Sequence, residues 1–173
     1  MTEQMSVKIA ALPSLRLTVE AHGLMAKKAL GQNFLLDQNI TDKIINLSLQ
    51  KQNKKDFSGA NVFEVGPGPG GLTRAVLAAE PKSLTVVEMD ERCIAIMNEI
   101  KEKTGDILHI INGDAMQTDF SVLAPAPRHI ISNLPYNISV PLLVGWLKNI
   151  NAYDSLTLMF QKEVAERITA PIK

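Results

Sequence analysis

The chain has 173 residues, of which 46% are hydrophobic and 21% are charged, and its formal net charge is zero. This size and composition indicate one globular domain with a buried core and exclude an intrinsically disordered chain. The lack of net charge excludes a protein that coats nucleic acid through bulk electrostatic attraction alone.

Charge is nevertheless uneven along the chain. Residues 1–55 contain eight lysines and arginines and four acidic residues, so residues 56–173 carry a balancing negative excess. We therefore divide the chain into an N-terminal basic helical segment, residues 1–55, and a core, residues 56–173. The basic segment can meet a phosphate backbone with one end of the molecule, or it can be an ordinary solvated surface.

Within the basic segment, residues 1–12 are expected to be poorly ordered, as chain ends often are. Apolar periodicity predicts helices over residues 15–25 and 37–49. A polar loop at residues 31–33 separates the two predicted helices.

The core alternates short apolar stretches with helical patterns. Strands are predicted at residues 61–65, 84–88, 107–111, 129–132 and 155–160. Helices are predicted at residues 72–79 and 91–103, from Ser139 as N-cap with Pro141 in the first turn, and from residue 164 onward. This alternation is typical of an α/β fold with a doubly wound, mainly parallel sheet, whose ligand crevice lies at the carboxyl ends of its strands. The fifth strand would be a bare edge, so we expect the sheet to be truncated after it.

The cellular setting follows from what the sequence lacks. Its single cysteine, Cys93, cannot form an internal disulfide, which fits a reducing compartment. No apolar run approaches the roughly 20 residues of a membrane span, and we find no secretory signal. The three histidines lack metal-ligand spacing. We expect a cytoplasmic monomer with no metal and no membrane partner.

The first predicted strand runs into a glycine-rich loop, Glu64-Val65-Gly66-Pro67-Gly68-Pro69-Gly70-Gly71. Glycines let this backbone turn sharply and approach a ligand closely. Glu88 ends the second strand, 22 residues after Gly66, where a carboxylate can accept both hydroxyls of a ribose. Asp114 follows the third strand and can accept a hydrogen bond from an adenine amine. The pattern predicts a site for a nucleoside cofactor.

Three of the loop glycines also satisfy the dinucleotide fingerprint, so the loop alone leaves both NAD and S-adenosylmethionine open. Two features favour the methyl donor. Pro67 and Pro69 remove backbone N–H donors that a pyrophosphate would use. Glu64 would repel phosphates and suits a cationic methionine moiety.

The fourth predicted strand ends in Asn133-Leu134-Pro135-Tyr136. An adenine amine is a poor nucleophile because its lone pair is delocalised into the ring. The side-chain carbonyl of Asn133 and the backbone carbonyl of Leu134 can accept its two N–H groups and draw the nitrogen towards tetrahedral geometry. Pro135 stiffens the turn, and Tyr136 offers a face on which an extruded base can stack, worth about 1–3 kcal/mol. These four residues are the predicted catalytic set.

Several segments together resemble the ribosomal RNA adenine dimethyltransferases, in the order in which that family carries them. They are residues 27–35, 64–71, Glu88 with Asp90, 113–115, 133–137 and 161–164. The resemblance covers about residues 15–173. It implies a Rossmann-like S-adenosylmethionine-dependent methyltransferase fold.

The resemblance also implies which residues hold the methyl donor. By family correspondence these are Asn33, Leu35, Gly66, Glu88, Asp114 and Asn133. The predicted cofactor site also includes four motif neighbours, Gln32, Glu64, Gly68 and Ala115. Residues 32–35 are expected to fold over the cofactor.

The activity implied is methyl transfer from S-adenosylmethionine to the exocyclic amines of two adjacent adenosines near the 3′ end of 16S rRNA, during biogenesis of the small ribosomal subunit. The products would be dimethyladenosine and S-adenosylhomocysteine. Family members usually continue with a β-hairpin and a small helical domain, which this sequence lacks. Three alternatives stay open: a large-subunit rRNA adenine methyltransferase of the resistance type, a non-catalytic RNA-binding ribosome-assembly factor, and an NAD-dependent oxidoreductase. Residues 27–35 favour the small-subunit target.

Overall fold

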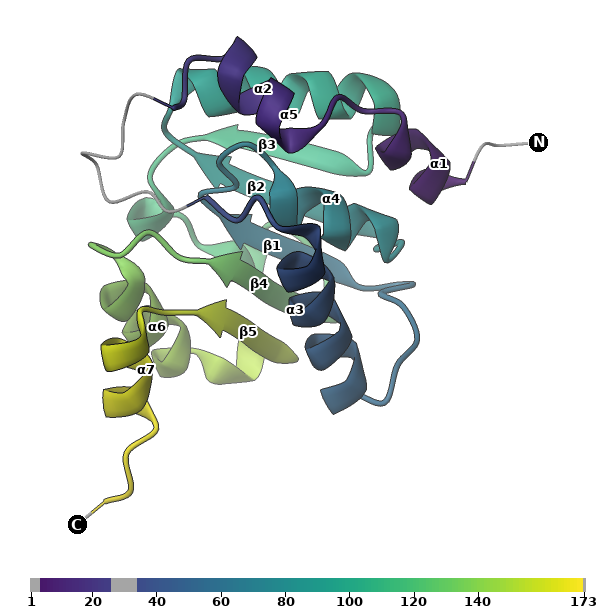
Figure 1. Ribbon diagram of the computed structural model, residues 1–173. Coiled ribbons are helices and arrows are strands. Elements are labelled where there is room, and N and C mark those ends of the chain that lie inside the picture. The colour runs from purple at the N-terminus through teal and green to yellow at the C-terminus, as the bar shows by residue number, and fades with distance from the viewer. Residues whose placement is uncertain (1–3, 26–33, 173) are drawn as a thin grey trace.

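A computed structural model describes residues 4–25 and 34–172, and its centre is a parallel five-stranded sheet (Figure 1). The strand order is β3-β2-β1-β4-β5, and every neighbouring pair runs parallel. The strands are β1 (Asn61–Val65), β2 (Ser83–Glu88), β3 (Leu108–Asn112), β4 (Arg128–Asn133) and β5 (Ser155–Met159). This order confirms the predicted doubly wound α/β sheet, because the chain starts at the centre, winds out to one edge and then returns to the other.

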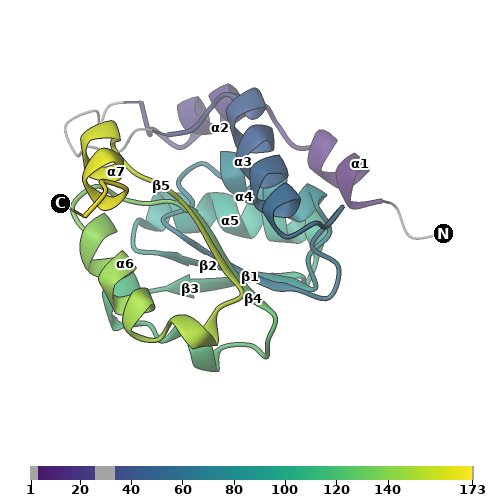
Figure 2. The ribbon, with the colours of Figure 1, turned by 90° about the horizontal axis from the view of Figure 1, so that it is seen from below.

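Helices cover both faces of the sheet (Figure 2). One face carries α3 (Gln38–Lys51), α4 (Gly71–Ala78) and α5 (Glu91–Thr104), and the other carries α6 (Ser139–Lys148) with the 3₁₀ turns at Ala115–Gln117, Phe120–Val122 and Ile150–Ala152. The remaining helices are α1 (Met5–Ala10), α2 (Leu15–Ala21) and α7 (Lys162–Ile168). Each face of the sheet therefore has its own buried apolar cluster, one built around Val62 and Leu77 and the other around Phe63 and Phe120.

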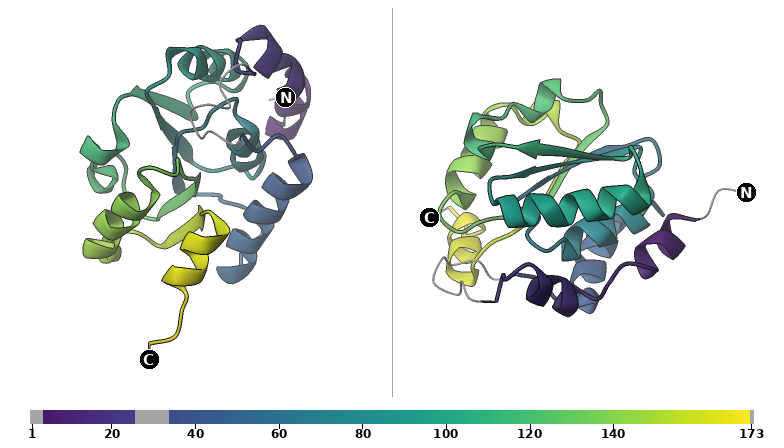
Figure 3. Two further views of the ribbon diagram at one scale, coloured as in Figure 1. Left: turned by 60° about the vertical axis from the view of Figure 1, so that its left-hand side comes forward. Right: turned by 90° about the horizontal axis from the view of Figure 1, so that it is seen from above.

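The N-terminal helices pack on the outer side of the α4–α5 layer (Figure 3). Arg74 of α4 donates a hydrogen bond to the Pro13 carbonyl at 2.7 Å, and Arg92 of α5 donates one to the Gly23 carbonyl at 3.2 Å. Ile45 of α3 belongs to the same buried cluster as Val62. Much of the predicted N-terminal segment thus shares its core with the sheet, and the division at residue 55 stays a prediction.

Three local expectations were wrong. Residues 5–10 form α1 rather than a disordered end, because Met5, Ile9 and Leu12 pack against the first cluster at helical spacing. The helix expected over residues 15–25 ends at Ala21, because Gly23 takes a φ of 66° and turns the chain.

The third wrong expectation was the N-cap of α6, because Ser139 does not act as the N-cap. Ile138 occupies the cap position, and the Ser139 hydroxyl donates a hydrogen bond to the Tyr136 carbonyl at 3.1 Å. Pro141 does lie in the first turn, as expected. The loop expected at residues 31–33 lies outside the described residues.

A buried hydroxyl joins the two central strands where their backbone pairing ends. Pairing between β1 and β4 runs only as far as Phe63 and Ile130. Two residues further on, Ser132 Oγ donates to the Val65 carbonyl at 2.7 Å and accepts from the Val65 N–H at 3.2 Å. The strands can therefore part at their carboxyl ends without leaving buried backbone groups unpaired.

We expect Ser132→Ala to lower the free energy of unfolding by about 1–3 kcal/mol, because it leaves the buried N–H and C=O of Val65 without partners. Urea denaturation followed by circular dichroism measures this. Ser6→Ala, on an exposed position of α1, is the matched control and should change stability by less than about 0.5 kcal/mol. Equal stability of the two variants would contradict the bridging role of Ser132.

Candidate active site

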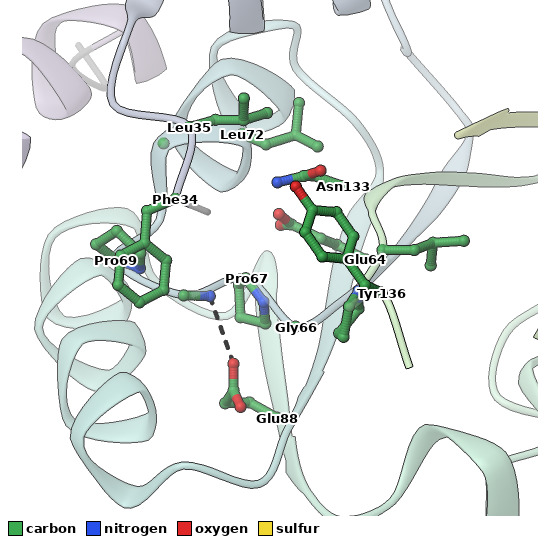
Figure 4. Close-up of a pocket in the computed structure, with 14 residues that line it drawn as sticks. Phe34, Leu35, Glu64, Gly66, Pro67, Pro69, Leu72, Glu88, Asn133 and Tyr136 are labelled. Carbon is green, nitrogen blue, oxygen red and sulfur yellow. Dashed lines mark hydrogen bonds between the residues drawn. The ribbon is translucent and has the colours of Figure 1, made fainter. Parts of the chain in front are cut away.

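A cavity opens at the carboxyl ends of β1, β2 and β4 (Figure 4). It gathers most of the predicted site residues, because parallel strands bring their carboxyl ends to one edge of the sheet. The residues that line it are Phe34, Leu35, Glu64, Gly66, Pro67, Gly68, Pro69, Gly71, Leu72, Glu88, Asn133, Leu134, Pro135 and Tyr136.

The glycine loop takes backbone conformations that favour glycine. Gly66, Gly68 and Gly70 have φ values of 63°, 56° and 93°. Glu88 holds the loop from the neighbouring strand, because its Oε2 accepts the Gly68 N–H at 3.4 Å. Its Oε1 accepts the N–H groups of the next two residues, at 2.9 and 3.0 Å. Glu88 therefore fixes both the end of β2 and the loop, and it also lines the cavity.

Two glycines of the loop are needed for a contact that sequence reasoning missed. A Cβ on Gly68 would lie 2.8 Å from the ring of Phe34, and one on Gly71 would clash with the Leu35 carbonyl oxygen. Phe34 and Leu35 therefore lie directly against the loop, as Figure 4 shows. Gln32 and Asn33 lie outside the described residues, and the expectation that residues 32–35 fold over a cofactor stays a prediction.

Glu64 is a buried carboxyl on the wall of the cavity, with 2% of its surface exposed. Its Oε2 accepts a hydrogen bond from the Thr73 hydroxyl at 2.7 Å. Burial raises the pKa of Glu64 to about 8; the Thr73 hydrogen bond opposes this rise, and the nearby charge of Glu88 adds to it. Thr73 is a further residue that the sequence pattern did not single out.

The Asn133–Tyr136 turn after β4 forms the wall of the cavity that faces the glycine loop. Asn133 is the last residue of β4, and the turn after it is closed by a hydrogen bond from the Ile138 N–H to the Pro135 carbonyl at 3.2 Å. The Pro135 ring packs against Gly66, where an added Cβ would lie 3.1 Å from the ring. Asn133 and Tyr136 both project into the cavity beside Glu64 (Figure 4). The turn and the glycine loop thus form one site.

Asp114 and Ala115 are not among the residues that line the cavity. The Asp114 side chain accepts the Met116 N–H at 2.8 Å and caps a 3₁₀ turn, while Ala115 is buried in the second apolar cluster. The neighbouring Gly113 donates to the Glu88 carbonyl at 3.0 Å, so this loop adjoins the same end of the sheet. The cofactor roles of Asp114 and Ala115 stay predictions.

Comparison with known proteins identifies the family. Residues 23–173 match the family described as ribosomal RNA adenine dimethylase. The chain belongs to this family. It is 52% identical over 160 residues to a ribosomal RNA small subunit methyltransferase A of Gluconobacter oxydans, a match that covers 92% of this chain and 51% of that protein.

Solved structures agree with this membership of the dimethylase family. A dimethyladenosine transferase from Plasmodium falciparum superposes with a TM-score of 0.65 at 30% identity, covering 81% of this chain and 47% of the other. The 23S rRNA methyltransferase ErmE superposes with a TM-score of 0.61 at 25% identity, and the match covers 79% of this chain and 51% of ErmE. The chain spans about half the length of the curated relatives it matches.

Two absences hold for the part of the chain that the structure describes. None of its helices has the length and apolar character needed to cross a membrane. Nor do its histidine, cysteine and acidic side chains form a group of three that could hold a metal ion.

We expect Gly71→Ala to lower the free energy of unfolding by about 1–3 kcal/mol, because the added methyl overpacks the contact with Leu35. Gly145→Ala is the matched control. Gly145 lies inside α6, and apart from its own helix backbone and its chain neighbours no atom lies within 4 Å of an added Cβ, so the free energy of unfolding should rise by about 0.5–1 kcal/mol. Urea denaturation of both variants measures the difference. Two equally tolerated substitutions would show that Leu35 does not constrain position 71.

Glu64 makes stability depend on pH. The folded protein keeps a proton on Glu64 up to about pH 8, whereas the unfolded chain releases it near the ordinary pKa of 4.5. The unfolded state therefore binds fewer protons between these values, and this contribution to stability falls as pH rises, by up to about 1.4 kcal/mol per pH unit. Urea denaturation at several pH values, for the native chain and for Glu64→Gln, isolates the effect. As pH rises, the free energy of unfolding of the native chain should fall relative to that of Glu64→Gln. Substitution of an exposed residue, Glu102→Gln, is the control and should give the same pH dependence as the native chain. If the native chain and Glu64→Gln showed the same pH dependence of stability, the raised pKa of Glu64 would be contradicted.

Proposed function

We propose that this chain carries the catalytic core of a small-subunit rRNA adenine dimethyltransferase. It would transfer methyl groups from S-adenosylmethionine to the exocyclic amines of two adjacent adenosines near the 3′ end of 16S rRNA. One observation carries the proposal: the Asn133–Tyr136 turn, the glycine loop and Glu64 line a single cavity. Family membership and the names of the relatives support the substrate.

The cavity fits a methyl donor better than a dinucleotide. Two of its loop residues, Pro67 and Pro69, have no N–H to offer a phosphate. Glu64 and Glu88 add two carboxyl groups to the same cavity, which disfavours an anionic pyrophosphate and suits a ligand that carries positive charge. An NAD-dependent reaction is therefore the weaker alternative.

Several residues would hold the donor. Glu88 presents a carboxylate at the end of β2, where it can accept ribose hydroxyls. Glu64 faces the cationic methionine part, and Leu35, Gly66 and Gly68 supply close backbone approach. When bound, S-adenosylmethionine supplies an electrophilic methyl group on a sulfonium sulfur. We retain Gln32, Asn33, Asp114 and Ala115 as proposed contacts on the family resemblance alone.

The turn after β4 would hold the target base. The Asn133 side-chain carbonyl and the Leu134 backbone carbonyl accept the two N–H groups of the adenine amine, which localises the nitrogen lone pair for in-line attack. Pro135 keeps the turn rigid against Gly66, and the Tyr136 ring stacks on the extruded base. The nitrogen loses its proton after it has become cationic, so positioning rather than a strong base accounts for the rate.

The target within the ribosome is proposed from sequence similarity. The chain is 52% identical to a small-subunit methyltransferase and 25% identical to the 23S rRNA enzyme ErmE. This difference favours 16S rRNA in the small subunit. A non-catalytic assembly factor would bind the same RNA without transferring methyl groups, so an activity assay separates the two.

The deciding measurement is mass spectrometry of small-subunit RNA after incubation of unmethylated subunits with the protein and S-adenosylmethionine. Dimethyladenosine at two adjacent positions supports the proposal. Binding of the subunit without transfer of methyl groups would favour the non-catalytic assembly factor. Methylation of large-subunit RNA alone would favour the large-subunit rRNA methyltransferase.

Within this assay, Asn133→Ala should reduce turnover by about 10²–10³-fold, because one preorganised acceptor of the amine is lost. Its affinity for S-adenosylmethionine, measured by calorimetry, should change little. Asn151→Ala, at an exposed position before β5, is the matched control and should retain full turnover. Normal turnover of the Asn133 variant would remove that residue from the mechanism.

A further inference from the structure

The only hydrogen bond found for the Glu64 carboxyl within residues 4–25 and 34–172 comes from a neutral partner, the Thr73 hydroxyl. The ion pairs found in this part of the chain do not include Glu64. Both residues are buried, Thr73 at 0% and Glu64 at 2% exposure. No cationic side chain among the described residues pairs with this carboxyl, so a cationic ligand that enters the cavity would stabilise its anionic form.

The Thr73 hydroxyl is directed differently from the other helical threonines. Thr18, Thr41 and Thr104 each donate to a carbonyl three or four residues earlier in the same helical turn, at 3.0 Å. Thr73 instead reaches from α4 back to the end of β1. Its one donor is therefore used to orient the Glu64 carboxyl.

We propose that Thr73 is a positioning residue of the methyl-donor site, and that binding of the donor releases the proton held by Glu64. Protonated Glu64 and the cationic ligand give a Glu64 carboxylate paired with that ligand, and the proton passes to solvent. This inference rests on the proposed function, because it takes S-adenosylmethionine as the ligand.

The groups that surround Glu64 set the direction of the effect. Glu88 of β2 lines the same cavity and favours the protonated form, and Tyr136, from the turn after β4, is the other titratable side chain on its wall. From α5, the uncharged Met97 sulfur lies 3.9 Å from the Thr73 hydroxyl. Burial among these groups holds the pKa of Glu64 near 8. Below that pH binding must displace a proton, so affinity rises with pH and levels off above it.

Removing the Thr73 hydroxyl takes away the only contact among the described residues that lowers the pKa of Glu64 and so favours the anion. The pKa of Glu64 then rises further, and a larger share of the binding energy is spent on removing its proton. Thr73→Val should therefore bind S-adenosylmethionine about tenfold more weakly at pH 7, the effect of one hydrogen bond to a charged group. The loss should shrink at higher pH, and Thr73→Ser should restore the native profile.

Isothermal titration calorimetry with S-adenosylmethionine tests this between pH 6.5 and 9, in buffers of different ionisation enthalpy, which count the protons released. The native chain should release close to one proton from Glu64 near pH 7, and Glu64→Gln should lack this proton. Comparing variants cancels the titration of the ligand's own amino group. Thr169→Val is the matched control and should behave as the native chain, because the exposed Thr169 hydroxyl donates to the Ala165 carbonyl of the preceding helix α7 and lies outside the cavity.

Three outcomes overturn the inference. A Thr73→Val affinity that falls equally at every pH would reduce Thr73 to a packing role. A proton count unchanged in Glu64→Gln would remove Glu64 from the coupling, and this test stands even if Thr73→Val fails to fold. In these two cases S-adenosylmethionine still binds, so the proposed function survives. Failure of the folded native chain to bind S-adenosylmethionine at any pH would overturn the inference and the proposed function together.

Discussion

The hydrogen bonds of Ser132 to Val65 are the constraint on which the site depends. Parallel strands normally stay paired to their ends, and a cavity between two central strands would leave buried backbone groups without partners. Here one hydroxyl satisfies both the N–H and the C=O of Val65 just where the pairing of β1 with β4 stops. The glycine loop can then leave β1 and the Asn133 turn can leave β4 as two separate walls that face one another.

The same few contacts hold both walls and the segment that covers them. Glu88 fixes the loop through Gly68, Pro135 packs on Gly66, and Phe34 with Leu35 lies on Gly68 and Gly71. The glycines therefore serve the protein's own packing as much as any ligand. A site assembled this way is preorganised, because its parts contact one another before any substrate arrives.

Sequence patterns predicted the strands and helices well, because each strand is a short apolar run bounded by turn residues and each helix has a clear apolar face. They failed at α1 and at the end of α2, where packing against a distant cluster and one left-handed glycine decide the outcome. Glu64, Glu88 and Asn133 could be placed together because all three lie at the carboxyl ends of parallel strands. Thr73 and Ser132 could not, since their roles depend on tertiary hydrogen bonds that no motif spacing marks. Residues 32–35 were expected to fold over the cofactor, but the contact of Phe34 with Gly68 depends on tertiary packing and could not be predicted.

The charge in the cavity links its structure to its chemistry. Two carboxyl groups share a largely buried wall, and burial makes the anionic form of Glu64 costly. A loop built for pyrophosphate would do the reverse and offer N–H donors, yet two positions of this loop are prolines. A site of this kind gains most from a ligand that brings its own positive charge, since the ligand offsets the cost of the buried carboxylate. The burial that raises the pKa of Glu64 is therefore the same property by which, under the proposed function, the cavity would favour a cationic methyl donor over an anionic dinucleotide.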